Sequence, residues 1–124
     1  WQAQRDWVLR ASGLNQPHLC KTRSATACLT FAARLAQRKE TIESDLEILK
    51  GWIRDLSVWP YAPRHVIHRD RSATLQGARA GIGERQLTAL WEAVELAQKA
   101  IAANSNLRLT LDVMALRMSE ALSA

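Results

Sequence analysis

His68, Arg69 and Asp70 form the part of this sequence that most resembles a catalytic signature. In protein kinases a His-Arg-Asp run supplies the catalytic Asp, and an Asn that binds magnesium follows at a fixed spacing. Leu75 stands at that position, and neither a glycine-rich phosphate loop nor a partner lysine accompanies the motif. We therefore predict that Asp70 is the N-cap of a helix, because a carboxylate can accept the free backbone N–H groups of a first turn.

A metal site would have to combine His65 and His68 with Cys20 and Cys28. Neither the histidine spacing nor the cysteine spacing matches the patterns of zinc sites, so we expect no bound metal. If both cysteines lie on one helix, they are roughly 12 Å apart, which is too far for a disulfide. Cys28 is therefore predicted to be a free thiol, buried as a small apolar side chain.

Phosphate binding would require a glycine-rich loop, and Gly77, Gly81 and Gly83 are the closest cluster of glycines. The Lys-Ser/Thr pair of a P-loop is absent, and Gln86 occupies the third-glycine position of a dinucleotide-binding motif. No Ser or Cys lies in a nucleophile motif, and carboxylates such as Glu40 are typical of solvated helix ends. We find no active site in this chain and expect no cofactor.

The composition is that of one globular domain: 124 residues, 48% hydrophobic and 23% charged. The chain begins with Trp1 and shows no charged-then-apolar leader, so we interpret residues 1–124 as a single C-terminal domain of a longer protein. It contains no apolar run of about 18 residues, which argues against a membrane span. Two cysteines are too few for a disulfide scaffold and favour the cytoplasm.

The net charge is +5, from 17 Lys and Arg against 12 Asp and Glu. These cations are spread along the chain and concentrate mildly from Arg64 to Arg85. A basic composition without a recognition element is weak support for DNA binding, and solvated basic faces are the simpler interpretation. A helical DNA-binding regulator stays open as an alternative, with Gly81-Ile-Gly83 as the turn of a candidate helix-turn-helix.

Apolar residues recur at helical spacing along the chain, and no segment has the alternation of a convincing β-strand. The predicted helices start at capping residues and end at Gly, Pro or polar residues. They cover residues 1–11, 24–36, 41–59, 70–80, 84–103 and 106–122, with Ser24, Thr41, Gly83 and Asn106 as N-caps besides Asp70. We therefore predict an all-α fold, a single compact bundle of five to six helices.

The last predicted helix carries more apolar surface than one packing face requires. Its main stripe at helical spacing consists of Leu107, Leu111, Met114, Ala115, Met118 and Leu122. Leu109, Val113 and Leu116 lie off that stripe, and a helix that is apolar on several sides must be covered on several sides. We therefore predict a protein interface formed by Trp91, Leu107, Leu109, Val113 and Leu116.

Four segments of the chain follow one another in a distinctive order. They are the run from Gly51 to Leu56, the His68-Arg69-Asp70 motif, the helix from Leu87 to Ala103, and the run from Asn104 to Asp112. Their order and spacing resemble the C-terminal collar domain of the delta prime subunit of the bacterial DNA polymerase III clamp loader. Related gamma/tau and delta collars share a similar last helix, so the assignment to one subunit stays open.

This resemblance implies a function in assembly. A collar joins the subunits of the clamp loader into a ring, and the ring loads a sliding clamp onto primed DNA. Its partners would be the gamma/tau and delta subunits, and an AAA+-like module, absent here, would precede this domain in the parent protein. DNA would be contacted only indirectly, through the complex. An independent protein-interaction adaptor, for instance a homodimer, stays open as a further alternative because it would equally explain the apolar excess.

Overall fold

The computed structural model describes residues 1–15 and 25–123, and over these residues the fold is all-α, as predicted. The α-helices are α1 (Gln2–Ser12), α3 (Ala25–Ala36), α4 (Ile42–Val58), α5 (Ser72–Ala80), α6 (Glu84–Ala102) and α7 (Leu107–Ser123). Two short 3-10 helices, η1 (Pro63–His65) and η2 (Arg69–Arg71), lie between α4 and α5. The predictions made for Cys20 and Ser24 fall outside the described residues.

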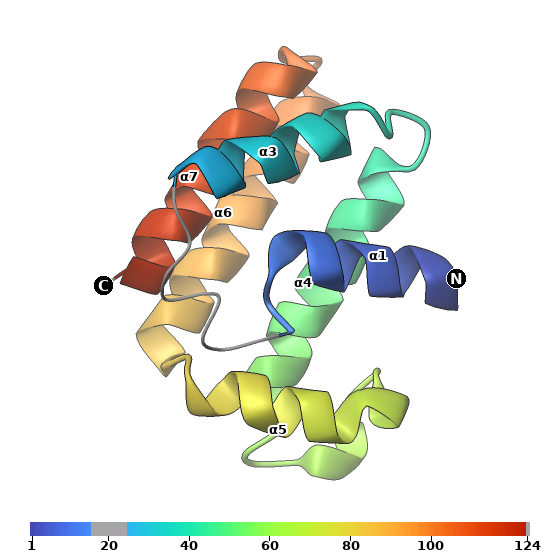
Figure 1. Ribbon diagram of the computed structural model, residues 1–124, viewed down its shortest axis with the longest axis vertical. Helices are drawn as coiled ribbons and strands as arrows, with labels where there is room; N and C mark the ends of the chain where they lie inside the picture. Colours follow the sequence, from blue (N-terminus) through green and yellow to red (C-terminus); the bar gives the residue numbers. More distant parts are fainter. Residues whose placement is uncertain (16–24, 124) are drawn as a thin grey trace.

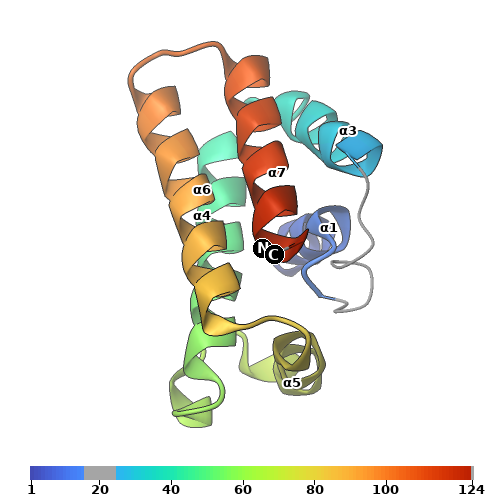
Figure 2. The same cartoon turned by 90° about the vertical axis from the view of Figure 1, so that its left-hand side faces the viewer.

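Three long helices form the body of the bundle, with α6 packed against both α4 and α7 (Figure 1). Helix α3 crosses α7, α1 crosses α4, and α5 closes the end of the bundle opposite the turn between α6 and α7. In the view of Figure 2, α7 lies between α6 and α3 with a long side toward the viewer. Two flanks of α7 are therefore covered by neighbouring helices, while a third flank faces outward.

The core of the bundle is apolar and takes residues from every described α-helix. Trp52 of α4 is fully buried, and its indole N–H donates to the carbonyl oxygen of Leu14 at 3.1 Å. Cys28 is a buried free thiol, as predicted. Trp1, by contrast, is exposed and does not belong to the core. The burial of Trp52 ties the loop after α1 to the centre of α4, since a buried indole N–H needs an acceptor.

Of the four predicted caps within the described residues, Thr41, Gly83 and Asn106 stand at helix starts and Asp70 does not. Asn106 Oδ1 accepts a backbone N–H of the first turn of α7 at 2.8 Å, which confirms the predicted cap. Gly83 is the N-cap of α6, where its N–H donates to the side-chain oxygen of Gln86 at 2.8 Å. Thr41 stands at the N-cap of α4, but its side chain makes no capping bond and contacts the carboxylate of Asp45.

The predicted cap at Asp70 is wrong. Asp70 lies inside η2, and α5 begins at Ser72 without a side-chain cap. Both carboxylate oxygens of Asp70 accept hydrogen bonds from the guanidinium of Arg5, at 2.8 and 2.7 Å. A bidentate, charge-assisted pair is stronger than a bond to a neutral backbone N–H, so the carboxylate joins α1 to η2 and caps no helix.

Candidate protein-interaction interface

Helix α7 presents an apolar ridge to the outside of the bundle. Leu109, Val113 and Leu116 succeed one another at i, i+4 and i+7, a spacing that places side chains on one stripe of a helix. They are 63%, 41% and 39% exposed, respectively. The buried residues of α7, from Leu111 to Leu122, belong to the core, as the sequence predicted. These three exposed residues are called the α7 ridge below.

An apolar groove of about 310 Å³ lies between the α7 ridge and α6. Leu96 of α6 borders it and is 49% exposed, although the sequence analysis did not single this residue out. The sequence pattern could have predicted this exposure, because Leu96 lies off the buried stripe of α6 just as Leu109 lies off that of α7. The groove is lined by Ala93, Leu96, Ala97, Ala100, Ser105, Leu109, Thr110, Val113, Met114 and Arg117.

A tight turn holds the two helices of the groove side by side. Asn104 takes a left-handed backbone conformation with φ of 61°, which Asn tolerates better than most residues. The hydroxyl of Ser105 donates to the carbonyl oxygen of Ala100 at 2.8 Å and lies 2.8 Å from the hydroxyl of Thr110. The end of α6, the turn and the start of α7 are thus joined by hydrogen bonds, and one end of the groove is fixed.

Three of the predicted interface residues, Trp91, Leu107 and Leu116, do not line the groove. Trp91 belongs to the side of α6 that meets α4, where the ammonium of Lys50 lies 4.5 Å from the centre of the indole ring. The same ammonium donates to the side chain of Gln98 at 3.0 Å, so this contact joins α4 to α6 within the chain. Leu107 is half buried and packs against the core. Of the predicted residues, Leu109 and Val113 line the groove, and Leu116 continues the same exposed stripe of α7 outside it.

The groove offers apolar contact and no catalytic group. Arg117 is the one charged residue among those that line it, and its polar members Ser105 and Thr110 are bonded to each other. Across residues 1–15 and 25–123, no three His, Cys, Asp or Glu side chains are placed to hold a metal ion. None of the described helices has the length and hydropathy needed to cross a membrane. An exposed apolar surface of this kind is suited to contact with another protein chain.

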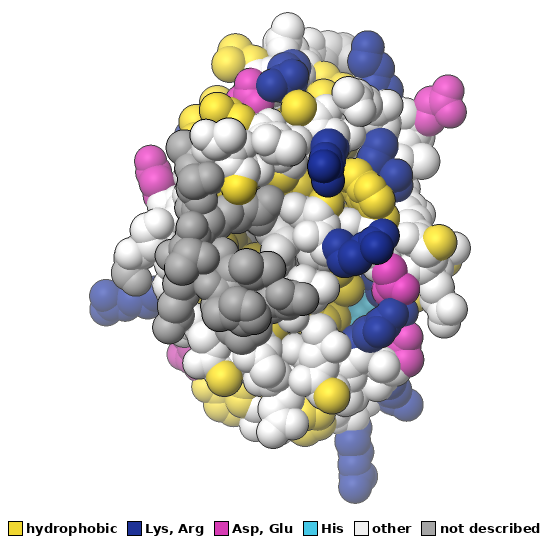
Figure 3. Space-filling view, in the orientation of Figure 1, with side chains coloured by type: hydrophobic (Ala, Val, Ile, Leu, Met, Phe, Trp, Pro, Cys, Tyr) yellow, Lys and Arg dark blue, Asp and Glu magenta, His cyan; other side chains and the backbone are white. Residues whose placement is uncertain are grey.

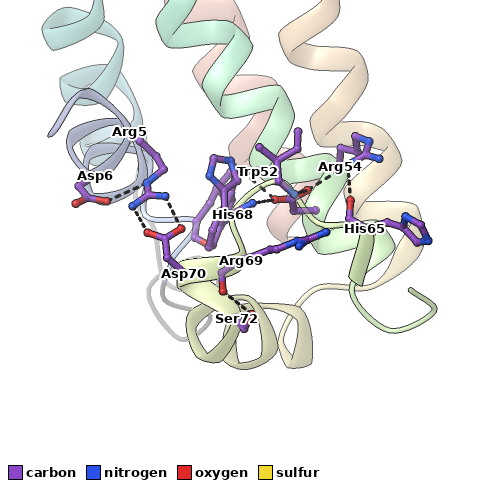
Figure 4. Close-up of polar contacts among 12 residues, drawn as sticks. Arg5, Asp6, Trp52, Arg54, His65, His68, Arg69, Asp70 and Ser72 are labelled. Atoms are coloured by element: carbon purple, nitrogen blue, oxygen red, sulfur yellow. Dashed lines mark hydrogen bonds and ion pairs between the residues drawn. The ribbon is translucent and has the colours of Figure 1, made fainter. Parts of the chain in front are cut away.

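A second region, where α1, α4 and η2 meet, is polar and almost fully paired (Figure 4). We call it the polar corner, and it consists of Arg5, Asp6, Asp55, His68, Asp70 and Arg71. Besides the pair between Arg5 and Asp70, Arg71 donates to Asp6 at 2.9 Å. The Arg5 guanidinium is buried, and its hydrogen bonds hold the pKa of the Asp70 carboxyl below its ordinary value. This arrangement fixes the start of α1 against the loop that follows α4.

The buried carboxylate of Asp55 organises that loop. One of its oxygens accepts the backbone N–H of Ile67 at 2.9 Å, and the other accepts the backbone N–H of His68 at 2.8 Å. Asp55 belongs to the Trp-Ile-Arg-Asp run of the predicted resemblance, but its role as an acceptor of loop N–H groups was not predicted. Periodicity cannot reveal this role, because it depends on a loop that returns to the helix twelve residues later.

His68 lies in an aromatic cage beside Asp55. Its ring stacks on that of Trp1 at 5.7 Å between centroids and tilts against Trp52 at 5.6 Å. Nε2 is 3.9 Å from the carboxylate of Asp55, while Nδ1 is buried without a hydrogen-bond partner among the described residues. Burial lowers the pKa of His68, and the nearby Asp55 carboxylate opposes that shift only in part. The imidazole is therefore held in its neutral form near neutral pH.

Three of the basic residues around α1, Arg5, Arg38 and Arg71, are paired with acids within the chain. Arg5 bonds to Asp70, and Arg38 donates to the buried carboxylate of Asp45 at 2.9 and 3.2 Å. In Figure 3, dark blue and magenta side chains accordingly lie beside one another on the side of the molecule formed by α1. This pairing removes much of the positive charge that a phosphate backbone would require there.

No family model, no curated protein and no solved structure matches this chain. A function for the domain must therefore be argued from the geometry of its surface and from the sequence resemblance.

Proposed function

We propose that this domain is a subunit-assembly domain that binds a neighbouring protein through the α7 ridge and the adjoining groove. The observation that carries the proposal is the exposure of Leu109, Val113 and Leu116 along one stripe of α7, with Leu96 of α6 exposed across the groove from Leu109 and Val113. Burying these side chains against another chain would be favourable by about 25 cal/mol for each Å² of apolar area removed from water. Their fixed helical setting would also limit the entropy lost on association.

The resemblance to clamp-loader collars suggests which complex this domain would join. On this proposal the domain is the collar of a delta prime subunit in a bacterial clamp loader, where it holds its neighbours in a ring in the cytoplasm. The partners would be the gamma/tau and delta subunits, and DNA would be reached through the complex as a whole. Two features support this choice over an enzyme: the groove is mainly apolar, and the charged side chains of the polar corner are engaged within the chain.

The experiment is to mix the domain with purified gamma/tau and delta subunits and to measure the mass of the complex by light scattering. Leu116→Glu and Leu109→Glu should leave the fold of the isolated domain intact and abolish the complex, since each places a charge inside the proposed contact. Ile67→Glu is the matched control, because Ile67 is a comparably exposed apolar residue in the loop after α4, away from the α7 ridge.

Three results would contradict the proposal. Unchanged complex formation by both ridge variants would exclude this surface as the contact. Equal weakening by Ile67→Glu would show that the effect is not specific to the ridge. A homodimer that is broken by Leu109→Glu, in a domain that binds no clamp-loader subunit, would replace the collar assignment with that of an independent adaptor.

A further inference from the structure

The loop between α4 and α5, with its flanking helices, is the most arginine-rich part of the described chain. Residues 54–85 contain six arginines, no lysine and three carboxylates. The loop lies at the end of the bundle where α5 is found, opposite the turn between α6 and α7 (Figure 1). Dark blue side chains project from this end in the space-filling view (Figure 3). This end is remote from the α7 ridge, so the proposed assembly function does not explain its charge.

The three carboxylates of this segment are all engaged by other groups. Asp55 is fully buried and accepts two backbone N–H groups of the loop. Asp70 is bound by Arg5, which comes from α1. Glu84 accepts the hydroxyl of Tyr61 at the edge of the loop. The acidic side chains therefore do little to neutralise the outward arginines, apart from a contact of 3.3 Å between Arg54 and the buried Asp55.

Two of the outward guanidinium groups are held in place by acceptors within the chain. Arg69 donates to the carbonyl oxygen of Arg64 at 2.7 Å, a neutral acceptor that orients the guanidinium and leaves its full positive charge. Arg54 of α4 donates to the carbonyl oxygen of His65 at 3.4 Å and to the buried carboxylate of Asp55 at 3.3 Å, which offsets part of its charge. Figure 4 shows Arg54 beside His65 and Arg69 of the loop. Arg64 itself is exposed, and its side chain makes no hydrogen bond or ion pair with another described residue.

We propose that Arg54, Arg64 and Arg69 form a binding surface for the phosphodiester backbone of a nucleic acid. Arginine offers a planar set of donors that matches phosphate oxygens, and guanidiniums that are already oriented lose less entropy when they bind. Arg64 and Arg69 stand in the two short helices of the loop and Arg54 on the adjoining part of α4, so the charges lie at one end of the bundle, where a repeating anionic backbone could contact them. An acidic protein segment is the other ligand that an arginine cluster can recognise, and it is tested below as a competitor. The inference is independent of the proposed assembly function.

The test is the binding of fluorescein-labelled DNA, as a duplex and as the single strand of the same sequence, followed by anisotropy over a series of salt concentrations. Three phosphate contacts predict a slope of log K against log salt of about −3 for the duplex and a shallower slope for the single strand. Arg64→Gln should reduce the slope by about one, because it removes one phosphate contact. Arg34→Gln is the matched control, since it removes an exposed arginine from α3 at the other end of the bundle.

A lower affinity and a shallower slope for Arg64→Gln, with both unchanged in Arg34→Gln, would support the surface. Equal losses in the two variants would overturn it, because they would reflect the net charge of the whole domain. Polyglutamate is the competitor that separates the two kinds of partner. If it binds more tightly than either form of DNA, the surface recognises acidic protein segments and the proposal is wrong. Circular dichroism of Arg64→Gln should show an unchanged helical content.

Discussion

The polar corner and the α7 ridge differ in whether their side chains have partners within the chain. In the polar corner, buried charged groups meet partners within the chain, as Arg5 meets Asp70 and Asp55 meets the loop N–H groups. On the α7 ridge, large apolar side chains such as Leu109 remain in water, although enough core exists to cover the other face of the same helix. In one region nearly all charged groups are paired within this chain, whereas in the other large apolar side chains stay exposed to water.

This difference determines what a substitution should change. A group whose partners lie inside the fold contributes to the free energy of unfolding, because its removal leaves those partners unsatisfied. A group that faces water contributes little to unfolding and can contribute much to association. Substitutions in the polar corner should therefore lower the free energy of unfolding, whereas substitutions on the α7 ridge should weaken association and leave unfolding nearly unchanged.

Asp55→Ala should give the largest loss of stability. The substitution leaves two backbone N–H groups of the loop without an acceptor, and unsatisfied buried donors together with a lost charged partner cost about 3–5 kcal/mol in the free energy of unfolding. Urea denaturation followed by tryptophan fluorescence measures this loss. Asp112→Ala is the control, because its i,i+4 pair with Arg108 lies largely in water. The control should cost less than about 0.5 kcal/mol, and equal losses would contradict the assigned role of Asp55.

Arg5→Lys should cost less, about 1–2 kcal/mol, since it keeps the charge and loses the two-point contact with Asp70. Arg5 also contacts Asp6, so a double-mutant cycle with Asp70→Asn is needed to isolate the pair. We expect a clear coupling energy between positions 5 and 70. A coupling energy near zero would show that the junction between α1 and η2 is held by packing alone, which would blur the contrast between the two regions.

Features that depend on local periodicity could be predicted from the sequence alone. The helical class, the cap at Asn106 and the division of α7 into buried and exposed stripes all follow from spacing of side chains within one helix. The prediction at Asp70 failed because local capping competed with a partner more distant in the chain. Arg5 donates two hydrogen bonds to the carboxylate of Asp70. The sequence around Asp70 does not indicate that α1 packs beside it.

The candidate site was predicted in part for the same reason. The exposure of Leu109, Val113 and Leu116 could be predicted because α7 is apolar on more than one side. The contact of Trp91 with Lys50 could not be predicted, because it depends on where α4 lies against α6. Leu96 was overlooked although its position off the buried stripe was visible. The pattern of a helix therefore indicates which residues lie off its buried stripe. The positions of the neighbouring helices determine which of these residues are exposed to solvent.

Acidification should destabilise the polar corner and leave the α7 ridge unaffected. Burial lowers the pKa of His68 below its ordinary value of 6.5, so the unfolded chain binds a proton at a higher pH than the folded chain. The contribution of the neutral imidazole is complete above pH 6.5 and is lost as the pH falls through the folded-state pKa. Urea titrations across this range should show a shallower pH dependence for His68→Gln than for the unchanged protein. Identical slopes, or greater stability in acid, would contradict this account.

Leu109→Ala should give the smallest change in stability, within about 0.5 kcal/mol of the unchanged protein. Leu111→Ala is the matched contrast, since the same substitution two residues further along α7 removes a fully buried side chain and should cost about 2–5 kcal/mol. Binding should rank the two variants in the reverse order, because Leu109 lines the groove and Leu111 does not. If Leu109→Ala destabilised the isolated domain as much as Leu111→Ala, the ridge would belong to the fold, and its exposure would not indicate a missing partner.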